Sequence, residues 1–396
     1  VALGWKISQE AFLRDSDILS DLKLRLSYGQ TGQQDILNDY PYMTTFTVSY
    51  PEACYQFGDK WYNTYRPNGY DSDIKWETTE TYNIGLDYGF LNNRIYGSVD
   101  YYQRHTKDLL NTIPVISGTN YSSVITTNIG EMDNKGVDAN LEYQTRIGNK
   151  VGLRLFGNLT YSKNKIVFRD EPAMQYAYQK SEGTRYGEFY GYIAEGYFQS
   201  EEEIKKSPRQ MRELAPGDIK YKDLNDDGVI DANDQCYLGK SWFPSWSYGM
   251  GFNINYHNFD LALFFQGVSD VSIMANGGSI DTGNGDWGAS GVGIVPFTGM
   301  GLNPSNVITK ALDRWTADNP RADAWYPRMT ANATTNDNNY VNSTHWLKDG
   351  SYLRLKQASL GYTLENKKLM DKGIEYLYFY LSGQNLLTFS KFKLWD

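Results

Sequence analysis

Residues 223–234, DLNDDGVIDAND, gather five carboxylates and two carboxamides around one glycine. Like charges at this density repel one another, and a bound cation would relieve the repulsion. A calcium loop needs oxygen ligands at positions 1, 3, 5, 7, 9 and 12, with glycine at position 6 for a sharp turn. The candidate ligands are Asp223, Asn225, Asp227, Val229 through its backbone carbonyl, Asp231 and Asp234, and the glycine is Gly228. The spacing therefore predicts a structural Ca²⁺ site.

Two features of this loop set it apart from an EF-hand. Asp234 stands where the EF-hand has glutamate, and its shorter side chain can supply one oxygen rather than two. The flanking segments GDIKYK and QCYLGK have the composition of strands, not of helices. An Asx-rich surface turn is the alternative interpretation, because Asp, Asn and Gly are common in turns.

Tryptophans in irregular segments are the candidate substrate-binding residues. Trp242, Trp246, Trp287 and Trp325 could stack on sugar rings, or they could pack within loops or at a lipid interface. No catalytic motif accompanies them: the sequence has no G-x-S-x-G elbow, no P-loop and no H-E-x-x-H helix. An enzyme is therefore not expected.

Composition narrows the class of protein. The chain of 396 residues has a net charge of −9, which argues against binding to nucleic acid. Its 33 tyrosines, 17 phenylalanines and 37 glycines favour strands and turns. No run of 18 apolar residues indicates a membrane helix, but strands of a membrane barrel need only about 9–11 residues. VALGWKISQE resembles neither a signal peptide nor a chain start, so we expect a piece of a longer protein.

Alternation of apolar and polar residues predicts antiparallel hairpins. Apolar and polar residues alternate through five pairs of segments, three of them joined by short turns at Asn92-Asn93, Gly148-Asn149 and His257-Asn258. The pairs are 1–7 with 21–29, 82–88 with 95–101, 137–143 with 153–161, 248–256 with 259–266, and 351–364 with 375–387. The sequence therefore predicts about ten strands.

Connections between these hairpins are long and have little periodicity. They span residues 30–75, 104–134, 162–246 and 268–346, and short helices are expected within them at 200–207 and 303–320. Short turns that alternate with long loops are typical of an up-and-down outer-membrane barrel, whose long loops are extracellular. A soluble secreted carbohydrate-binding β-protein, with calcium as a staple, remains the alternative, because a sheet packed on a core has the same alternation.

Longer stretches resemble the SusC-like TonB-dependent transporters of the Bacteroidetes outer membrane. The resemblance rests on seven stretches in family order: IKWETTETYNIGLDYGFLNNRIYGSVDYYQRHTKDLL (74–110), NIGEMDNKGVDANLEY (128–143), EFYGYIAEGYFQSEEEI (188–204), PGDIKYKDLNDDGVIDANDQCYLG (216–239), NFDLALFFQG (258–267), RWTADNPRADAWYPR (314–328) and SYLRLKQASLGYTL (351–364). It covers nearly the whole chain.

The resemblance implies a fold and a set of partners. The fold is a 22-stranded transmembrane barrel of which residues 1–396 form a part, and the plug domain and last strands are expected outside this chain. The implied function is TonB-dependent uptake of oligosaccharides or peptides across a Gram-negative outer membrane. The implied partners are a SusD-like surface lipoprotein lid, the TonB complex reached through an N-terminal part, outer-membrane lipid, and a second copy of the SusC–SusD pair.

Overall fold

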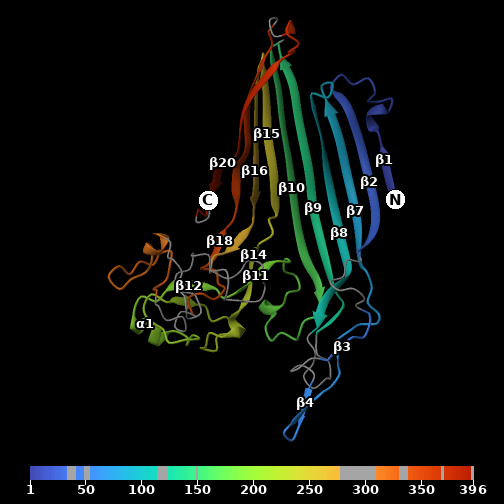
Figure 1. Ribbon diagram of the computed structural model, residues 1–396. Coiled ribbons are helices and arrows are strands. Elements are labelled where there is room, and N and C mark those ends of the chain that lie inside the picture. Colours follow the sequence, from blue (N-terminus) through green and yellow to red (C-terminus); the bar gives the residue numbers. More distant parts are fainter. Residues whose placement is uncertain are drawn as a thin grey trace. The chain divides into compact units, whose positions relative to one another are not determined.

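The computed structural model describes residues 1–33, 42–48, 54–113, 124–148, 150–276, 309–329, 338–366 and 370–393. Ten strands of these residues join in one antiparallel sheet, in the order β1-β2-β7-β8-β9-β10-β15-β16-β19-β20 (Figure 1). Their bounds are β1 Ala2–Trp5, β2 Leu19–Gln33, β7 Glu77–Phe90, β8 Ile95–Ile113, β9 Ile125–Ile147, β10 Val151–Arg169, β15 Trp246–Tyr256, β16 Phe259–Ser269, β19 Tyr352–Leu364 and β20 Leu377–Ser390. Each strand neighbours the next large strand of the sequence, as an up-and-down meander requires. The predicted all-β fold is confirmed.

Tight turns fall where the sequence placed them. Asn92 and Asn93 adopt positive φ angles of 57° and 59° between β7 and β8, a conformation that asparagine tolerates better than most residues. Gly148, at φ 57°, follows β9, and His257, at φ 50°, joins β15 to β16. The residue types at these three turns therefore allowed the hairpins to be predicted from the sequence.

Strands β8 and β9 extend well beyond their predicted ends. The expectation that residues 104–134 form an irregular connection is therefore wrong for the parts that these strands cover. The two strands have 19 and 23 residues, which is about twice what a membrane-spanning strand needs. The extra segments carry polar groups in cross-strand pairs: Thr79 and Thr106 hydroxyls lie 3.0 Å apart, and His105 Nδ1 lies 2.7 Å from an Asp133 oxygen. In these segments the strands continue to pair, but polar side chains replace the apolar ones. The alternation of apolar and polar residues is lost, so it could not predict these parts of the strands.

The chain divides into two compact units. Unit 1 is Val1–Asn93, Gly97–Asp138 and Lys163–Pro172, and unit 2 is Arg94–Tyr96, Ala139–Ser162 and Ala173–Asp396. Unit 1 also holds two small ribbons, β3 (Phe46–Thr47) with β6 (Arg66–Pro67) and β4 (Cys54–Phe57) with β5 (Lys60–Asn63), and the 3₁₀ helix η1 (Ile7–Gln9). Among the described residues, no helix is long and apolar enough to cross a bilayer.

The shorter elements of unit 2 lie together. In Figure 1, β11, β12, β14, β18 and α1 gather at one end of β15 and β16, while the β15–β16 and β19–β20 turns lie at the opposite end. The short strands pair as β11 (Glu188–Gly191) with β14 (Cys236–Ser241), β12 (Ala194–Tyr197) with β13 (Ile219–Tyr221), and β17 (Ser272–Met274) with β18 (Leu347–Asp349). The helical elements are α1 (Glu201–Lys206), η2 (Ala177–Gln179), η3 (Ala232–Asp234) and η4 (Thr309–Leu312).

One of the two expected helices is present and the other is wrong. Helix α1 begins after Ser200, whose side chain accepts a hydrogen bond from the Glu203 N–H, and it ends before Ser207. In the expected helix 303–320, residues 303–308 lie outside the described part, and only η4 is helical beyond them. Trp315 N–H donates to the Tyr326 carbonyl at 2.9 Å, so a bridge to a distant segment replaces the helix. Ala311 and Trp315 are buried in a loop core while Leu312 is 75% exposed, so the apolar spacing does not mark a helical face here.

Candidate functional site: a two-faced wall and a loop core

The long strands of unit 1 carry charges on one side. Arg25 of β2 lies between Asp87 of β7 and Asp100 of β8, with Nη2 at 2.7 Å and 2.8 Å from their carboxylates. These side chains are about one-third exposed or less. Two carboxylates on one guanidinium leave a net negative charge, so this side of the unit is suited to water and not to lipid.

The opposite side of the same strands is apolar. The register sets Leu26 beside Ile84 and Tyr28 beside Tyr82, with the two tyrosine rings 4.9 Å apart. Ile84 is 53% exposed and Tyr82 is 52% exposed, so no protein layer of the described residues covers them. Because side chains alternate along a strand, one row meets water and the neighbouring row presents hydrocarbon.

Unit 2 repeats this division across its strands. One register row runs from Leu153 through Ile254, Leu261, Leu360 and Leu381, so every residue in it is aliphatic. Leu360 is 50% exposed and Leu381 is 77% exposed. An exposed row of leucines is unfavourable in water, and it gains stability in contact with lipid tails.

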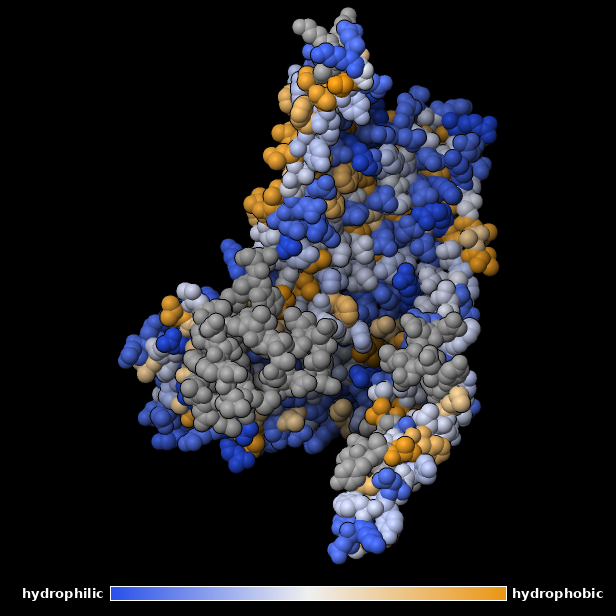
Figure 2. All heavy atoms as spheres, in the orientation of Figure 1, coloured by the Kyte–Doolittle hydropathy of each residue, from blue (hydrophilic) through white to orange (hydrophobic). Residues whose placement is uncertain are grey.

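Many of the alternate residues of unit 2 are polar, although Phe156 and Phe264 also stack on this side. Arg154 Nε lies 2.7 Å from Glu142 Oε1, and Tyr378 donates from its hydroxyl to Asp260 Oδ2 at 2.9 Å. Figure 2 shows a face of the strands that is mainly hydrophilic. One alternate row, formed by Arg154, Asn253, Ala262, Ser359 and Ser382, is therefore polar except for a single alanine.

A sheet packed on a dry interior does not describe these strands. The buried hydrophobic residues of the described chain concentrate in the loop segments of unit 2, while large apolar side chains along the strands stay exposed. Exposed apolar surface of this extent marks contact with a membrane or with another protein. The alternative interpretation, a soluble sheet with one face on a core, therefore fits poorly.

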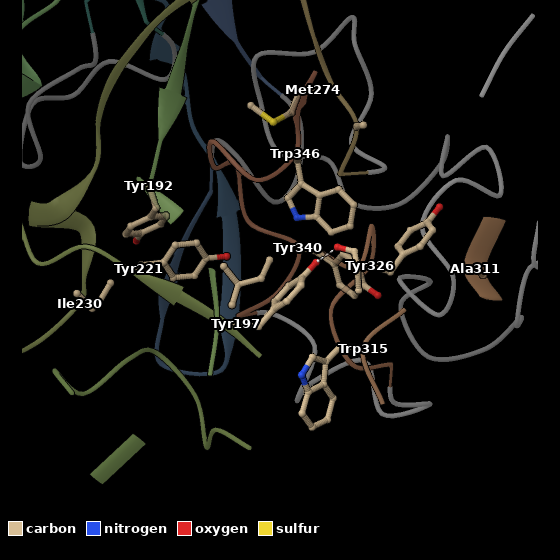
Figure 3. Packing of buried hydrophobic residues seen from close by; sticks show 13 residues of the cluster. Tyr192, Tyr197, Tyr221, Ile230, Met274, Ala311, Trp315, Tyr326, Tyr340 and Trp346 are labelled. Atoms are coloured by element: carbon tan, nitrogen blue, oxygen red, sulfur yellow. Dashed lines mark hydrogen bonds between the residues drawn. The ribbon is translucent and has the colours of Figure 1, made fainter. Parts of the chain in front are cut away.

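The loops of unit 2 form a hydrophobic core of their own (Figure 3). Its members come from two connections that are far apart in the sequence, before β15 and after β16. They are Tyr192, Tyr197, Ile219, Tyr221, Ile230, Met274, Ala275, Ala311, Trp315, Ala324, Tyr326, Tyr340 and Trp346. Trp346 and Tyr326 are fully buried, and burial raises the pKa of Tyr326 well above the ordinary value. Two loops therefore fold as one packed body.

Buried polar groups join the two connections. Asp218 Oδ1 accepts from Asn339 Nδ2 at 2.8 Å, and Asp218 Oδ2 accepts from Arg328 Nη2 at 2.9 Å. Ile219 N–H donates to Asn339 Oδ1 at 2.9 Å, and Trp346 Nε1–H donates to the Asn339 carbonyl at 2.6 Å. Asp218, Asn339 and Trp346 are fully buried, so these bonds are protected from water and specify how the loops meet.

A buried histidine lies beside this core. His345 packs edge-on against Trp346, with ring centroids 4.7 Å apart, and burial lowers the pKa of His345 to about 3. Lys348 places its ammonium 5.1 Å from the ring centroid of Trp325, and burial lowers the pKa of this lysine too. His345 is therefore neutral at physiological pH and acts as a packing residue.

The DLNDDGVIDAND loop folds mainly onto its own backbone. Gly228 has φ 82°, as the sharp turn requires, and its N–H donates to Asp223 Oδ2 at 2.8 Å. Asp234, fully buried, accepts from the N–H groups of Leu224 and Asp231 at 2.7 Å and 2.9 Å. Among the described residues, no group of three acidic, histidine or cysteine side chains converges as a metal site.

One oxygen of this loop has no protein partner. Asp223 Oδ1 is buried and makes no hydrogen bond, which is costly for a carboxylate oxygen. It belongs to position 1 of the predicted calcium loop. A cation bound to this oxygen would provide the missing partner, so the residue types fit Ca²⁺. The other carboxylate oxygens of Asp223 and Asp234 accept hydrogen bonds from backbone N–H groups.

The four candidate tryptophans do not form one site. Trp287 lies outside the described residues. Trp325 packs against the core, with its ring centroid 4.4 Å from that of Tyr326. Trp246 begins β15 on the apolar side, 4.5 Å from the Tyr161 ring, a position typical of an interfacial aromatic belt. Trp242 is 39% exposed and lies in a turn before β15.

Trp242 belongs to an aromatic cluster that the sequence did not reveal. Its ring centroid lies 4.9 Å from that of Phe243, which in turn stacks on Tyr186 at 5.8 Å. Tyr186 is 55% exposed and Phe243 is 41% exposed. The two turns that carry these rings are 55 residues apart, so only a signal for long-range contact could have found the cluster.

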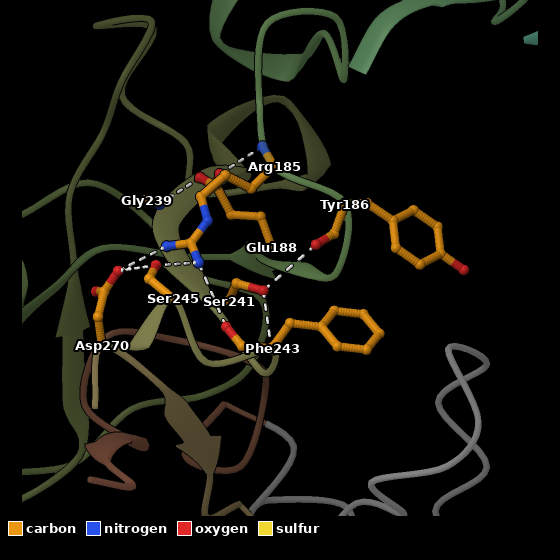
Figure 4. A network of polar contacts seen from close by, with 8 residues as sticks. All are labelled: Arg185, Tyr186, Glu188, Gly239, Ser241, Phe243, Ser245 and Asp270. Carbon is orange, nitrogen blue, oxygen red and sulfur yellow. Dashed lines mark hydrogen bonds and ion pairs between the residues drawn. The ribbon is translucent and has the colours of Figure 1, made fainter. Parts of the chain in front are cut away.

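A polar network beneath the rings fixes both turns (Figure 4). Arg185 donates from Nη1 to Asp270 Oδ2 at 3.1 Å and from Nη2 to Ser245 Oγ at 2.8 Å. Ser241 Oγ donates to the Tyr186 carbonyl at 3.3 Å and accepts from the Phe243 N–H at 3.0 Å. Burial opposes ionisation of Asp270, but the Ser245 hydrogen bond and the Arg185 charge together lower the pKa of this carboxyl.

The fold and the two-faced strands define the class of an outer-membrane-type β-barrel wall. Comparison with known proteins agrees with this assignment. Residues 1–386 match the family described as TonB dependent receptor-like, beta-barrel. The chain therefore belongs to this family.

Individual relatives lie within the same group. The chain is 30% identical to the TonB-dependent receptor SusC of Bacteroides thetaiotaomicron over 99% of this chain and 37% of that protein. It is 29% identical to TonB-dependent receptor P3 of Formosa agariphila, again over 99% of this chain and 37% of the relative. It superimposes on the RagAB peptide importer in the 'open-open' state with a TM-score of 0.72 and 23% identity, covering 39% of that chain. The chain thus spans about two-fifths of the length of the relatives it matches.

Proposed function

We propose that this chain forms part of the wall of a SusC-type importer in a Gram-negative outer membrane. The importer takes up oligosaccharides or peptides with energy supplied through TonB. The observation that carries the proposal is the two-faced register, in which the row Leu153, Ile254, Leu261, Leu360, Leu381 is aliphatic and the alternate rows carry polar and charged groups. A wall between lipid and water requires this division. Transport without chemical change is part of this proposal, because the sequence carries no G-x-S-x-G elbow, no P-loop and no H-E-x-x-H helix.

The partners follow from the same proposal. A SusD-like surface lipoprotein covers the extracellular loops, and two such pairs associate. The packed body made by the two unit 2 loops supports this, because a docked lid needs a rigid surface. Mild detergent extraction should yield the lipoprotein with the transporter, at a mass of two pairs. If the transporter is extracted without a lipoprotein, the proposed lid is wrong.

Uptake measurements test the function. Cells that express the protein should accumulate labelled oligosaccharides or peptides, and the accumulation should stop when TonB is deleted. Loss of this gene alone should have the same effect. Accumulation that persists without TonB, or that is unchanged by loss of this protein, would refute the proposal. Recovery of the protein in the soluble fraction without detergent would instead favour a secreted binding protein.

We also propose that the loop 223–234 binds Ca²⁺ as a structural ion. Asp223, Asn225, Asp227, Asp231 and Asp234 with the Val229 carbonyl would hold it, and the buried unpartnered Asp223 Oδ1 supports this proposal. The ion would stiffen the connection 162–246 and would supply no chemistry. Chelation with EGTA should increase proteolysis within 162–246 and leave the strands intact. Equal cleavage with and without EGTA would contradict the calcium proposal.

A further inference from the structure

We infer that Lys135, Lys163 and Lys165 form a docking site for the phosphate-bearing headgroup of a glycolipid in the outer leaflet. These three side chains are called the lysine patch below, and all of them belong to unit 1. The inference rests on the proposed function, in which the apolar side of the strands faces lipid and the long connections lie outside the cell. It assigns a lipid partner to that wall.

The lysine patch lies on the apolar side of β9 and β10. Tyr161 belongs to this side, and Lys163 and Lys165 follow it two and four residues further along β10. On β9, Lys135 shares its side with Leu141, which is 50% exposed. The three lysines are themselves exposed. Alternation along the two strands therefore directs all three ammonium groups to the side that presents hydrocarbon.

The lysine patch begins where the apolar row of β10 ends. Every second residue from Leu153 to Tyr161 is apolar or glycine, over about the length that crosses a bilayer. The row ends in an aromatic residue, as rows of barrel strands do at the membrane interface. Lys163 is the next residue on the same side. In the proposed membrane placement, the lysine patch therefore lies at the level of the lipid headgroups.

Pairing of β9 with β10 brings the lysines together. The two strands are neighbours in the sheet, and Asp170 N–H donates to the Ile129 carbonyl at 3.2 Å. Lys135 is six residues from Ile129, and Lys163 is seven residues from Asp170, so the two lysines lie at nearly the same level of the ladder. Like charges at facing positions of two strands are destabilising, and an anion between them would remove this cost.

Nearby carboxylates are committed to other partners. Asp133 Oδ1 lies 2.7 Å from His105 Nδ1, Glu131 Oε2 lies 3.9 Å from His105 Nε2, and Glu80 Oε1 lies 3.4 Å from Lys107 Nζ. These pairs draw the acidic groups toward β8, away from β10. Within the described part of the chain, the lysine patch forms no ion pair. Its ammonium groups are therefore available to a phosphate, which accepts charge-assisted hydrogen bonds through several oxygens.

A second role for lysines at this place needs no phosphate. β10 pairs with β15 as far as Tyr161, so among the described strands the segment beyond it is paired on one side only. Lysines on such an edge discourage pairing with another chain. Repulsion of other strands does not distinguish a phosphorylated lipid from an unphosphorylated one, whereas a headgroup site does.

Lipid titration by native mass spectrometry tests the inference on the full-length transporter in detergent. The probes are lipid A with its phosphates, the same lipid after enzymatic removal of phosphate, and inorganic phosphate. At low salt, we expect the parent protein to bind phosphorylated lipid A about tenfold more tightly than the dephosphorylated form, because each lysine adds attraction to an anionic headgroup. Lys135→Gln, Lys163→Gln and Lys165→Gln combined should abolish this preference, and the corresponding triple arginine variant should retain it.

The matched control removes three exposed lysines elsewhere. Lys60→Gln, Lys205→Gln and Lys206→Gln combined lower the net charge by the same amount and should leave the preference unchanged. All variants are compared after heat-modified gel migration shows a folded barrel. An equal loss in this control would overturn the inference, because net charge alone would then explain lipid binding.

Three other outcomes would also overturn the inference. They are equal binding of the two lipids by the parent protein, an undiminished preference in the triple glutamine variant, and displacement of the lipid by excess inorganic phosphate. TonB-dependent uptake, measured separately, distinguishes the inference from the proposed function. Uptake that requires TonB without any lipid preference refutes the lysine patch alone, whereas uptake that is independent of TonB refutes the importer.

Discussion

Breaking the buried Arg328–Asp218 pair should loosen the loop core of unit 2. Arg328→Ala leaves the Asp218 carboxylate, which is 0% exposed, with neutral donors only. Breaking a buried pair costs about 3–5 kcal/mol, and because the Arg328 side chain is 24% exposed, a discount for water access gives roughly 2–4 kcal/mol. With a urea slope of about 2 kcal/mol per M, the unfolding midpoint of the loop core should fall by roughly 1–2 M.

Pulse proteolysis in urea measures this change on the full-length protein in detergent. Cleavage within 173–245 or 309–346 reports unfolding of the loop core, and the strands provide an internal reference. Arg321→Ala is the control, because Arg321 pairs with Asp313 at the surface, where the side chains are 42% and 28% exposed. An exposed pair contributes little to stability, so the urea midpoint of this variant should move little. Equal shifts for the two variants would refute the argument that Asp218 needs Arg328.

Three other predictions follow from the burial, sidedness and loop geometry described above. As the pH falls below 6.5, the unfolded state protonates His345 while the folded state keeps it neutral down to about 3, so the loop core should lose roughly 2–3 kcal/mol between pH 6.5 and 4.5. Urea midpoints should show this slope, and an equal slope in His345→Gln would contradict it. Leu155→Arg on the apolar side should cost about 2–4 kcal/mol in equilibrium folding into lipid vesicles, whereas Asn158→Arg on the polar side should cost far less; equal costs would contradict the sidedness. Asp223→Asn should abolish terbium luminescence excited through the protein's tyrosines, and a luminescent Asp223→Asn variant would exclude this residue as a ligand.

The sequence predicted the strands because each carries its own signal. Alternation in 82–88 and 248–256, and the turn residues Asn92-Asn93, are local patterns that need no knowledge of distant contacts. The same reasoning failed where both sides of a strand are polar. Residues near His105 and Asp133 pair in a regular ladder without any hydrophobic period, so the sequence predicts a loop where these strands continue.

The loop core and the aromatic cluster around Trp242 could not be predicted from local sequence patterns. Trp315 has the spacing of a helical residue, yet its partner is Tyr326 across a bridge, and this pairing depends on the whole packed body. Tyr186 and Phe243 come together only because Ser241 and Arg185 fix two distant turns. Among the predicted ligand residues that the structure describes, Trp242 alone joins this cluster. The calcium loop had a strong local motif, and its metal binding stays a prediction.

The central claim is that lipid covers one side of the strands and water the other. Leu360→Cys and Ser359→Cys, labelled with an environment-sensitive fluorophore in a Cys54→Ser background of the full-length protein, test it on adjacent residues of β19. In reconstituted membranes, the label at 360 should be quenched by spin-labelled lipid tails and shielded from iodide. The label at 359 should show the reverse. Equal iodide quenching at both positions, with no effect of spin-labelled lipid, would contradict the account.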